Sequence, residues 1–352
     1  MKEILIGTNE AGQRFDKFLS KYMRKAPKSF FYKMLRKKNI TLNGKKATGQ
    51  EILSKGDQVK LFLSDETIEN FSDYSMIKKS HSKAHNAVLD NKVKLDILYE
   101  NDDVLFLNKP VGMLSQKAKS TDITLNEYFI KYLLDTDSIT EEQLQTFRPS
   151  ACNRLDRNTS GIVACGKTLK ALQILSEMFR TRTLEKYYLC LVKGCVNQKK
   201  KIDGYLLKNE KKNKVMIIDE ATYNSIEDPS QIHRIQTEYD PICSSNDVTL
   251  LKVHLITGKT HQIRAHLASE GHPIIGDPKY GDIELNKKMQ KQFGLRHQLL
   301  HARILRFPKM EGDKYHPIEQ ELSEKEIIAT LPDLFVKICN SKGVLKNGNM
   351  EL

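Results

Sequence analysis

Residues 153–168 read NRLDRNTSGIVACGKT, a polar turn followed by an apolar run. The apolar residues at 161–165 favour burial in a strand, and the turn before them holds one acid, Asp156, between Arg154 and Arg157. Taken alone, Asp156 fits a common role of aspartate in turns, where the carboxylate caps backbone amides. The stretch therefore predicts a buried strand that begins directly after a charged turn.

The end of this stretch, GIVACGKT at residues 161–168, also fits the phosphate-binding pattern GxxxxGK[ST]. A phosphate loop must leave a strand, present backbone N–H groups and enter a helix. Here the four intervening residues are apolar and the upstream stretch is polar, so the required strand does not precede the motif. We therefore expect a strand at this position and no nucleotide cofactor.

The apolar runs on both sides of this stretch are short and typical of strands. They include LDILYEND from residue 95, VLFLNKP from 104, YYLCLVKG from 187 and VTLLKVHLI from 248. Helical periodicity intervenes at about 123–134 and 167–182, and an amphipathic helix is expected near 324–339. The mixture predicts an α+β fold over residues 94–338, built on a mixed, largely antiparallel sheet and followed by a tail at 339–352.

A basic segment precedes this region. The chain carries a formal charge of +13, and residues 1–65 hold fifteen Lys and Arg against six Asp and Glu. Two short amphipathic helices, at 14–25 and 29–38, precede a hairpin whose turn is Asn43-Gly44. We expect a small basic α+β domain at 1–65, with nucleic acid as the first candidate partner, and a linker at 66–93. The side chains expected to contact the nucleic acid here are Arg14, Lys33, Arg36 and Lys37.

Several other functions have little support in the sequence. No apolar run approaches the roughly 20 residues that a membrane helix needs, and residues 1–5 have no signal-peptide core. The six cysteines form no CxxC pair, which favours free thiols in a cytoplasmic protein. His261, His266 and His272 are spaced by five and six residues, and the alternating pattern before Ala265 favours a strand, so we expect no metal site.

Five segments occur in the order seen in one enzyme family. They are LNKPVGMLSQ (107–116), NRLDRNTSGIVACGKT (153–168), EKYYLCLVKG (185–194), TGKTHQIRAHLASEGHPIIGDPKYG (257–281) and LHARILRFP (300–308). Together they resemble the RluA-type pseudouridine synthases, and the N-terminal helices and hairpin resemble the S-four RNA-binding domain of the RluC and RluD branch. The chain departs from the usual pattern at Asn153 and Lys259, and Ser115 and Gln116 stand where a histidine often occurs.

The resemblance implies an isomerase that breaks the bond from ribose to uracil nitrogen, turns the base and rejoins it through carbon, with no cofactor. Asp156 matches the catalytic aspartate, Arg264 the arginine that pairs with it, and Tyr188 the tyrosine beside the base. The carboxylate would stabilise or trap the positive sugar, or accept a proton from it. A nearby guanidinium would keep the carboxylate charged inside the pocket.

The resemblance also assigns residues to RNA contact. Arg154 resembles the side chain that fills the space left by a flipped nucleotide. Arg157 is expected either on backbone phosphate or in a surface salt bridge. Lys109 is expected at the rim of the cleft, where it would touch phosphate or be solvated.

Three further residues are expected around the pocket. His261 and Gln262 would hold Arg264, with Gln262 also contacting RNA. His261 and Leu305 would line the pocket, and a plain core position stays open for Leu305. The partner that the resemblance implies is RNA, with large-subunit ribosomal RNA as the family expectation. A non-catalytic RNA-binding factor for ribosome assembly on the same scaffold stays open as an alternative.

Overall fold

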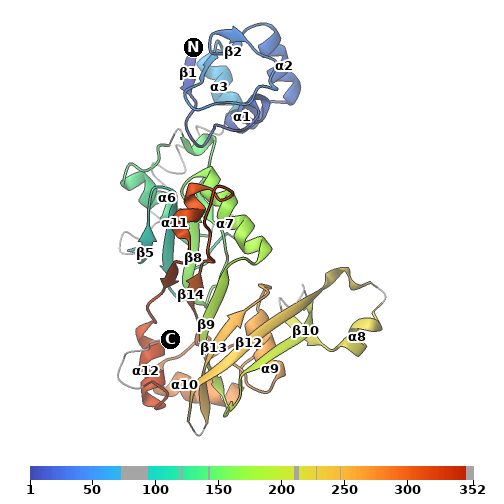
Figure 1. Cartoon of the computed structure of the whole chain (residues 1–352), viewed down its shortest axis with the longest axis vertical. Coiled ribbons are helices and arrows are strands. Elements are labelled where there is room, and N and C mark those ends of the chain that lie inside the picture. The colour runs from blue at the N-terminus through green and yellow to red at the C-terminus, as the bar shows by residue number, and fades with distance from the viewer. Residues whose placement is uncertain are drawn as a thin grey trace.

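The computed structural model describes residues 1–72, 94–117, 119, 122–141, 143–209, 214–226, 228–245 and 247–345. Figure 1 shows an elongated molecule in which residues 1–72 form a small unit at one end and the other described residues form a larger unit. Of the expected linker at 66–93, residues 73–93 lie outside the described residues. Residues 66–72 belong to the small unit.

The small unit is a four-stranded antiparallel sheet with three helices. Its elements are β1 (Lys2–Leu5), α1 (Phe15–Tyr22), α2 (Lys28–Arg36), β2 (Ile40–Leu42), β3 (Lys45–Lys46), β4 (Gln58–Leu61) and α3 (Asp65–Phe71), with strand order β1-β4-β2-β3. Asn43 and Gly44 both have positive φ, 51° and 72°, as the predicted two-residue hairpin turn requires. Ile68 of α3 is buried in the core of this unit, so the unit extends past the expected boundary at residue 65.

The described residues of the larger unit contribute eleven strands to one sheet. The strand order is β11-β10-β12-β13-β9-β14-β8-β6-β5, with β15 paired to β14 and β7 paired to β8. The bounds are β5 (Ile97–Glu100), β6 (Val104–Lys109), β7 (Ser150–Ala151), β8 (Ser160–Gly166), β9 (Glu185–Lys193), β10 (Lys200–Asn209), β11 (Lys214–Ile218), β12 (Ile232–Ser244), β13 (Val248–Leu255), β14 (Leu300–Arg306) and β15 (Glu326–Ile328). Among these pairs, β8 with β14 is parallel and the others are antiparallel, which confirms the expected fold class.

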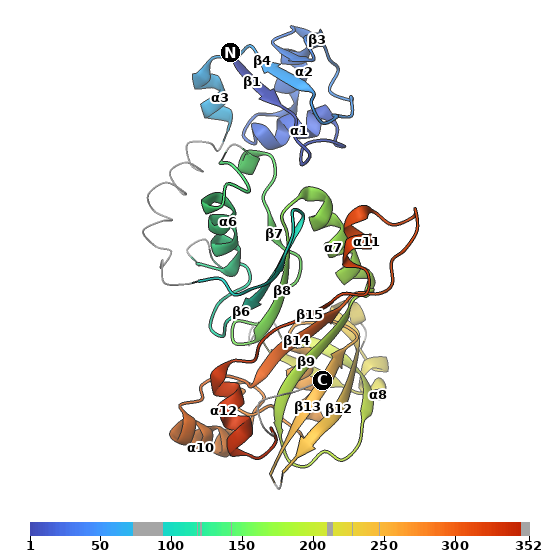
Figure 2. The ribbon, with the colours of Figure 1, turned by 60° about the vertical axis from the view of Figure 1, so that its left-hand side comes forward.

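Helices and short 3-10 turns lie beside this sheet. They are α6 (Leu125–Asp135), α7 (Leu169–Thr181), α8 (Glu220–Asn224), α9 (Gln262–Ser269), α10 (Ile283–Phe293), α11 (Pro317–Leu322), α12 (Asp333–Ser341) and the 3-10 turns at Gln143–Gln145 and Pro229–Gln231. Figure 2 shows α10 and α12 together at the end remote from the small unit. Their apolar side chains share one cluster that includes Met289 and Phe335.

Three local expectations are wrong. The segment before Ala265 is helix α9 rather than a strand, because a buried helix beside β10, β11 and β12 overrides the short alternating pattern. The helix expected near 324–339 is strand β15 followed by α12. The expected tail begins too early, since Val344 and Leu345 are buried against α10 and α12.

Strand β8 is where the sheet and the charged turn meet. All seven of its residues are buried, as the apolar run at 161–165 predicts. Gly161 has a φ of 111°, and a Cβ atom there would lie 2.2 Å from the carbonyl oxygen of Ala302 on β14. The parallel pairing of β8 with β14 therefore requires glycine at position 161, the second residue of β8. This pairing anchors the loop at 153–159 to the centre of the sheet.

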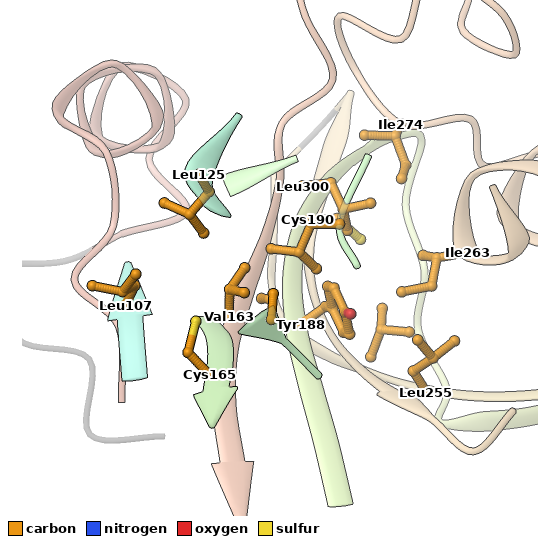
Figure 3. Packing of buried hydrophobic residues seen from close by; sticks show 14 of the residues in the cluster. Leu107, Leu125, Val163, Cys165, Tyr188, Cys190, Leu255, Ile263, Ile274 and Leu300 are labelled. Atoms are coloured by element: carbon orange, nitrogen blue, oxygen red, sulfur yellow. The ribbon is translucent and has the colours of Figure 1, made fainter. Parts of the chain in front are cut away.

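The largest core cluster brings Tyr188 of β9 next to this junction. It is formed by side chains of β6, β8, β9, β13, β14 and helices α6 and α9. Figure 3 shows Tyr188 between Val163 of β8 on one side and Leu255 and Ile263 on the other. The aromatic side chain is 8% exposed, so packing holds the ring rigidly at this position.

Hydrogen bonds between described residues connect the small unit to the larger one. The Oε1 atom of Glu10 accepts a hydrogen bond from the Thr146 hydroxyl at 2.6 Å, and the Oδ1 atom of Asn9 accepts one from the Leu169 amide at 2.9 Å. Glu10 is 5% exposed, so this carboxylate is buried at the junction of the two units.

Candidate active site

A cleft of about 890 Å³ lies over the junction of β8, β9 and β14. The charged turn at 152–159 forms one wall, residues 258–264 and Lys279 form another, and the end of α7 with the start of β9 completes it. Tyr188, Leu255 and Leu300 supply apolar lining surface. The cleft therefore combines an apolar lining with a strongly charged rim, which suits a flat base attached to a phosphate backbone.

One guanidinium connects two carboxylates at the centre of this cleft. Nη1 of Arg264 donates to Oδ2 of Asp156 at 2.8 Å, while Nε and Nη2 donate to Oδ2 and Oδ1 of Asp277 at 2.7 and 2.9 Å. The Asp277 side chain has no exposed surface, whereas 26% of the Asp156 side chain is exposed. The structure thus brings Asp156 and Arg264 together, as expected, and leaves the Asp156 carboxylate open to the cleft.

The electrostatics of the Arg264–Asp277 pair favour the charged forms of both side chains. Burial would lower the pKa of Arg264, but its hydrogen bonds and ion pairs with Asp277 and Asp156 outweigh burial and raise the pKa. Burial would raise the pKa of Asp277, but the hydrogen bond from Arg264 and backbone amides hold that pKa below its usual value. One cation between two carboxylates leaves an excess negative charge, and the open Asp156 carboxylate is the group that can present it to a ligand.

Asp277 was absent from the sequence-based site. It follows Gly276 in the segment GDPKYG, and its Oδ1 atom also accepts hydrogen bonds from the amides of Lys279 and Tyr280 at 2.8 and 3.1 Å. An aspartate in a turn with Gly and Pro is normally solvated, so the local sequence does not distinguish it from a simple turn residue. Its function as the support of Arg264 is visible only from the ion pair.

Lys109 is not at the rim of the cleft, where it was expected. It is fully buried, and its Nζ atom donates to the carbonyl oxygens of Pro110, Met113 and Arg157 at 3.0, 2.8 and 3.3 Å. Burial lowers the pKa of Lys109 to about 7, although the charge of Asp156 opposes the shift. An ammonium group enclosed by three backbone carbonyls holds two loops together and has no access to phosphate.

The loop after Lys109 also supports the charged turn. The Ser115 hydroxyl donates to the Leu155 carbonyl and accepts from the Leu155 amide, both at 3.1 Å. The Gly112 amide donates to the Arg157 carbonyl at 2.9 Å, and Nε of Arg157 donates to the Gly112 carbonyl at 3.0 Å. Ser115, where a histidine often stands in the family, therefore connects the two loops through the backbone next to Asp156.

Tyr188 and His261 line the cleft, as expected. Burial and then the negative charge of Asp156 raise the pKa of Tyr188, so its phenol remains protonated. Nε2 of His261 lies 3.9 Å from Oδ2 of Asp156, and Nδ1 lies 3.1 Å from the Tyr280 hydroxyl. Burial lowers the pKa of His261 more than the Asp156 charge raises it, which favours the neutral imidazole.

The expected functions of Gln262 and Leu305 do not fit their surroundings. Gln262 is 1% exposed, and its amide bonds to the Thr257 and Thr237 hydroxyls and to the Gln236 carbonyl. These bonds join α9 to β12 and the segment after β13, so Gln262 lines the cleft without holding Arg264. Leu305 is 3% exposed and packs in the core cluster that includes side chains of α7, and it is not among the residues that line the cleft.

The other expected RNA contacts are on accessible surfaces. Arg154 and Arg157 are exposed and line the cleft. In the small unit, Arg14 is engaged in an ion pair with Asp16 at 2.9 Å. The other expected cations of that unit are exposed on or just after α2: Lys33, Arg36 and Lys37.

The stretch that fits a phosphate loop has another structure. Residues 160–166 form β8, and Nζ of Lys167 donates to Oε1 of Glu100 and to the Asn101 carbonyl, both at 2.8 Å. Among the described residues, no group of three His, Cys, Asp or Glu side chains could hold a metal ion. Within the same residues, none of the helices has the length and hydropathy needed to span a bilayer.

Comparisons with known proteins agree with this site. The sequence model of the family described as RNA pseudouridylate synthase matches residues 103–269. The ribosomal large subunit pseudouridine synthase C of Vibrio vulnificus (strain CMCP6) is 32% identical over 328 residues, which cover 91% of this chain and 92% of the relative. The protein of the same name from Escherichia coli (strain K12) is 30% identical over 332 residues, covering 92% and 94% of the two chains.

A solved structure supports the fold. Human RNA Pseudouridylate Synthase Domain Containing 4 superposes with a TM-score of 0.56 at 21% identity, over 78% of this chain and all of the human chain. The sheet, the cleft with Asp156 and the extent of these matches lead to one assignment. This chain belongs to the RNA pseudouridine synthase family and is an isomerase of that class.

Proposed function

We propose that this protein isomerises one or more uridines of large-subunit ribosomal RNA and that Asp156 is the catalytic carboxylate. The observation that carries the proposal is the open Asp156 carboxylate, which accepts a hydrogen bond from Arg264 at 2.8 Å. Arg264 is itself held by its ion pair with the buried Asp277. The target is inferred from relatives that are named for the large ribosomal subunit and match nine-tenths of this chain.

The reaction needs a negative group beside the sugar. When the bond from C1′ to N1 of uracil breaks, positive character develops on the ribose and the base leaves as an anion. Asp156 either bonds to C1′, in a bond that breaks again when C5 attacks C1′, or takes a proton from the sugar and later returns it. After the base has turned, C5 bonds to C1′ and loses its proton while N1 gains one, so the product is an isomer of the substrate. Arg264 donates a hydrogen bond that orients the carboxylate during both steps.

The uracil must leave the RNA stack to reach this carboxylate. Flipping a nucleotide costs a few kcal/mol, and stacking on an aromatic ring and filling the vacated space offset part of this cost. Tyr188, buried at the base of the cleft, is the proposed stacking surface and proton donor, because its phenol remains protonated. Arg154, exposed on the charged turn, is the proposed occupant of the vacated space.

The small basic unit is proposed to bind RNA outside the cleft, in the manner of an S-four domain. The exposed cations of α2, Lys33 and Arg36, and the adjacent Lys37 are available for phosphate contacts. Two hydrogen bonds, from Thr146 and from the Leu169 amide, hold this unit against the catalytic part. Such an arrangement would contribute affinity and target choice without supplying reacting groups.

The test is to compare wild type with Asp156→Asn on an unmodified large-subunit ribosomal RNA transcript. We expect pseudouridine formation to fall by a factor on the order of 10⁴ or more, because the variant lacks the charge that the reaction needs. RNA binding should be retained, since phosphate contacts supply most of the affinity. Glu284→Gln, on an exposed position of α10, is the matched control and should leave the rate unchanged.

Two results would contradict the proposal. The first is a transcript in which wild type forms no pseudouridine. The second is an Asp156→Asn enzyme that retains more than about a hundredth of the activity, since such a residue would not be the reacting carboxylate. A non-catalytic assembly factor would instead be unaffected by Asp156→Asn in a ribosome-assembly assay.

A further inference from the structure

Two cations, Arg182 and Lys186, line the cleft but belong to none of the groups described above. Arg182 ends α7 and Lys186 is the second residue of β9. Lys186 precedes Tyr188 by two residues, and residues two apart on a strand point to the same side at a separation of about 7 Å. The ammonium group therefore lies along the strand from the aromatic ring that is proposed to receive the base.

The neighbouring carboxylates are engaged elsewhere. Oε2 of Glu185 accepts from Nη1 of Arg306 at 3.1 Å and from the Tyr187 hydroxyl at 3.0 Å. Glu177, one turn before the end of α7, forms a bidentate ion pair with Arg180. Within the described residues, the side-chain nitrogens of Arg182 and Lys186 form no hydrogen bond or ion pair.

The backbone of Arg182 adds an independent observation. It caps α7 in the left-handed conformation, with φ 63° and ψ 29°. Glycine is the usual residue at such a cap, and a side chain there is less favourable because Cβ crowds the following carbonyl. An arginine at this position is unfavourable for the helix end, yet it places a guanidinium at the rim of the cleft.

The two positive charges also oppose each other. Burial and then the charge of Arg182 lower the pKa of Lys186, so the empty cleft disfavours the ammonium form. A dianionic or monoanionic oxygen group between them would remove this repulsion and supply the missing hydrogen-bond acceptors. An anion at this place would therefore be stabilised by both cations.

We propose that Lys186 and Arg182 form a subsite that binds one phosphate of the RNA next to the flipped uridine. This inference rests on the proposed function and adds to it the residues that hold the target strand on the α7 side of the cleft. A nucleotide spans the distance between a base and its phosphate with one sugar, which matches the step along β9 from Tyr188 to Lys186. The subsite faces the sugar–phosphate backbone and leaves Asp156 and Arg264 free for the sugar carbon.

The experiment measures RNA affinity and turnover separately on an unmodified large-subunit ribosomal RNA transcript. The variants are Lys186→Gln, Lys186→Arg, Arg182→Gly and the double variant Lys186→Gln with Arg182→Gly. The matched control is Lys170→Ala, which removes one exposed positive charge from α7 outside the cleft. Binding is titrated at several salt concentrations, and pseudouridine formation gives kcat and KM.

We expect Lys186→Gln to raise KM about tenfold with kcat within about twofold, because a charge-assisted contact is lost before the chemical step. Lys186→Arg should restore most of the affinity. The double variant should lower the slope of log affinity against log salt by about 0.7, the value for one phosphate on single-stranded RNA. Arg182→Gly should weaken binding while its melting temperature equals or exceeds that of wild type, since glycine relieves the left-handed cap.

The outcomes separate this subsite from the proposed function. Unchanged affinity and salt dependence in the double variant would overturn the subsite even if wild type modifies the transcript normally. A decrease of about 1.4 in the slope of log affinity against log salt would mean that Lys186 and Arg182 bind two separate phosphates. That result would overturn the proposal that they share one phosphate. If wild type binds RNA but forms no pseudouridine, the proposed function fails, and the salt titration of the variants still decides whether the subsite exists.

Discussion

Replacing Asp277 by asparagine tests how the catalytic carboxylate is held. Oδ1 of Asp277 accepts three hydrogen bonds, from Nη2 of Arg264 and from the amides of Lys279 and Tyr280, whereas Oδ2 accepts one from Nε of Arg264. Asparagine can keep the carbonyl at the Oδ1 position. Its amide nitrogen then faces Nε of Arg264, so two donors oppose each other and the buried guanidinium keeps only the partly exposed Asp156 as a counter-charge.

The expected loss of stability is large because both partners are buried. The side chains of Asp277 and Arg264 are 0% and 5% exposed, so solvent screens the pair little. Removing one partner of such a pair costs about 3–5 kcal/mol of unfolding free energy. Asp156→Asn should cost at most about 1 kcal/mol, because the Asp156 side chain is 26% exposed and its ion pair is partly solvated.

The difference in unfolding free energy between wild type and Asp277→Asn should depend on pH. Burial would raise the pKa of Asp277, but the hydrogen bond from Arg264 lowers it below the usual value of 3.8. A carboxyl group whose pKa is depressed by folding contributes stability above that usual value and loses it as pH falls through the folded-state pKa. The stability gap between wild type and Asp277→Asn should therefore be full at pH 7 and narrow below about pH 4.

The assay is urea unfolding at pH 7 and at pH 3.5, combined with pseudouridine formation at pH 7. We expect a turnover about 10²-fold below wild type, since a misplaced Arg264 no longer orients Asp156. Asp282→Asn is the matched control: it changes a partly exposed helix-capping aspartate five residues away and should leave turnover intact. An Asp277→Asn protein within about 1 kcal/mol of wild type at pH 7 would refute the reasoning.

Two further predictions follow from the supports of the charged turn. Lys109→Met should remove a pH dependence of stability. The pKa of Lys109 is lowered to about 7 in the folded protein, so the unfolded chain binds more protons than the folded chain between pH 7 and 9. The unfolding free energy of wild type should therefore rise by roughly 2–3 kcal/mol across that window, while that of the variant does not rise. An equal gain in both proteins in urea unfolding would contradict this. Gly161→Ala should cost about 1–3 kcal/mol, because its Cβ atom would meet the Ala302 carbonyl at 2.2 Å. Gly258→Ala, where the nearest atom is 3.9 Å away, is the control, and equal melting temperatures for the two variants would disprove the clash.

Local chemistry accounts for the elements that sequence reasoning located. The apolar run at 161–165, the Asn43-Gly44 turn and the stripe of α1 each depend on residues close in sequence, and each is present in the structure. Motif order accounts for the family, because five short segments in sequence identify it without any coordinates. Where the alternating apolar pattern was short, as before Ala265, packing against β10, β11 and β12 favours a helix instead of a strand.

By itself, the sequence determined the family, the mixed α+β class and the approach of a charged turn to a buried strand. The tertiary structure decided which cations reach a ligand: Lys109 is enclosed by three carbonyls, whereas Lys186 lines the cleft. It also decided that Asp277 supports Arg264, whose partner Asp156 lies 108 residues away. The reason is physical: burial, and therefore the charge state and partners of a side chain, depends on surfaces that come together only when the distant strands of the sheet pair.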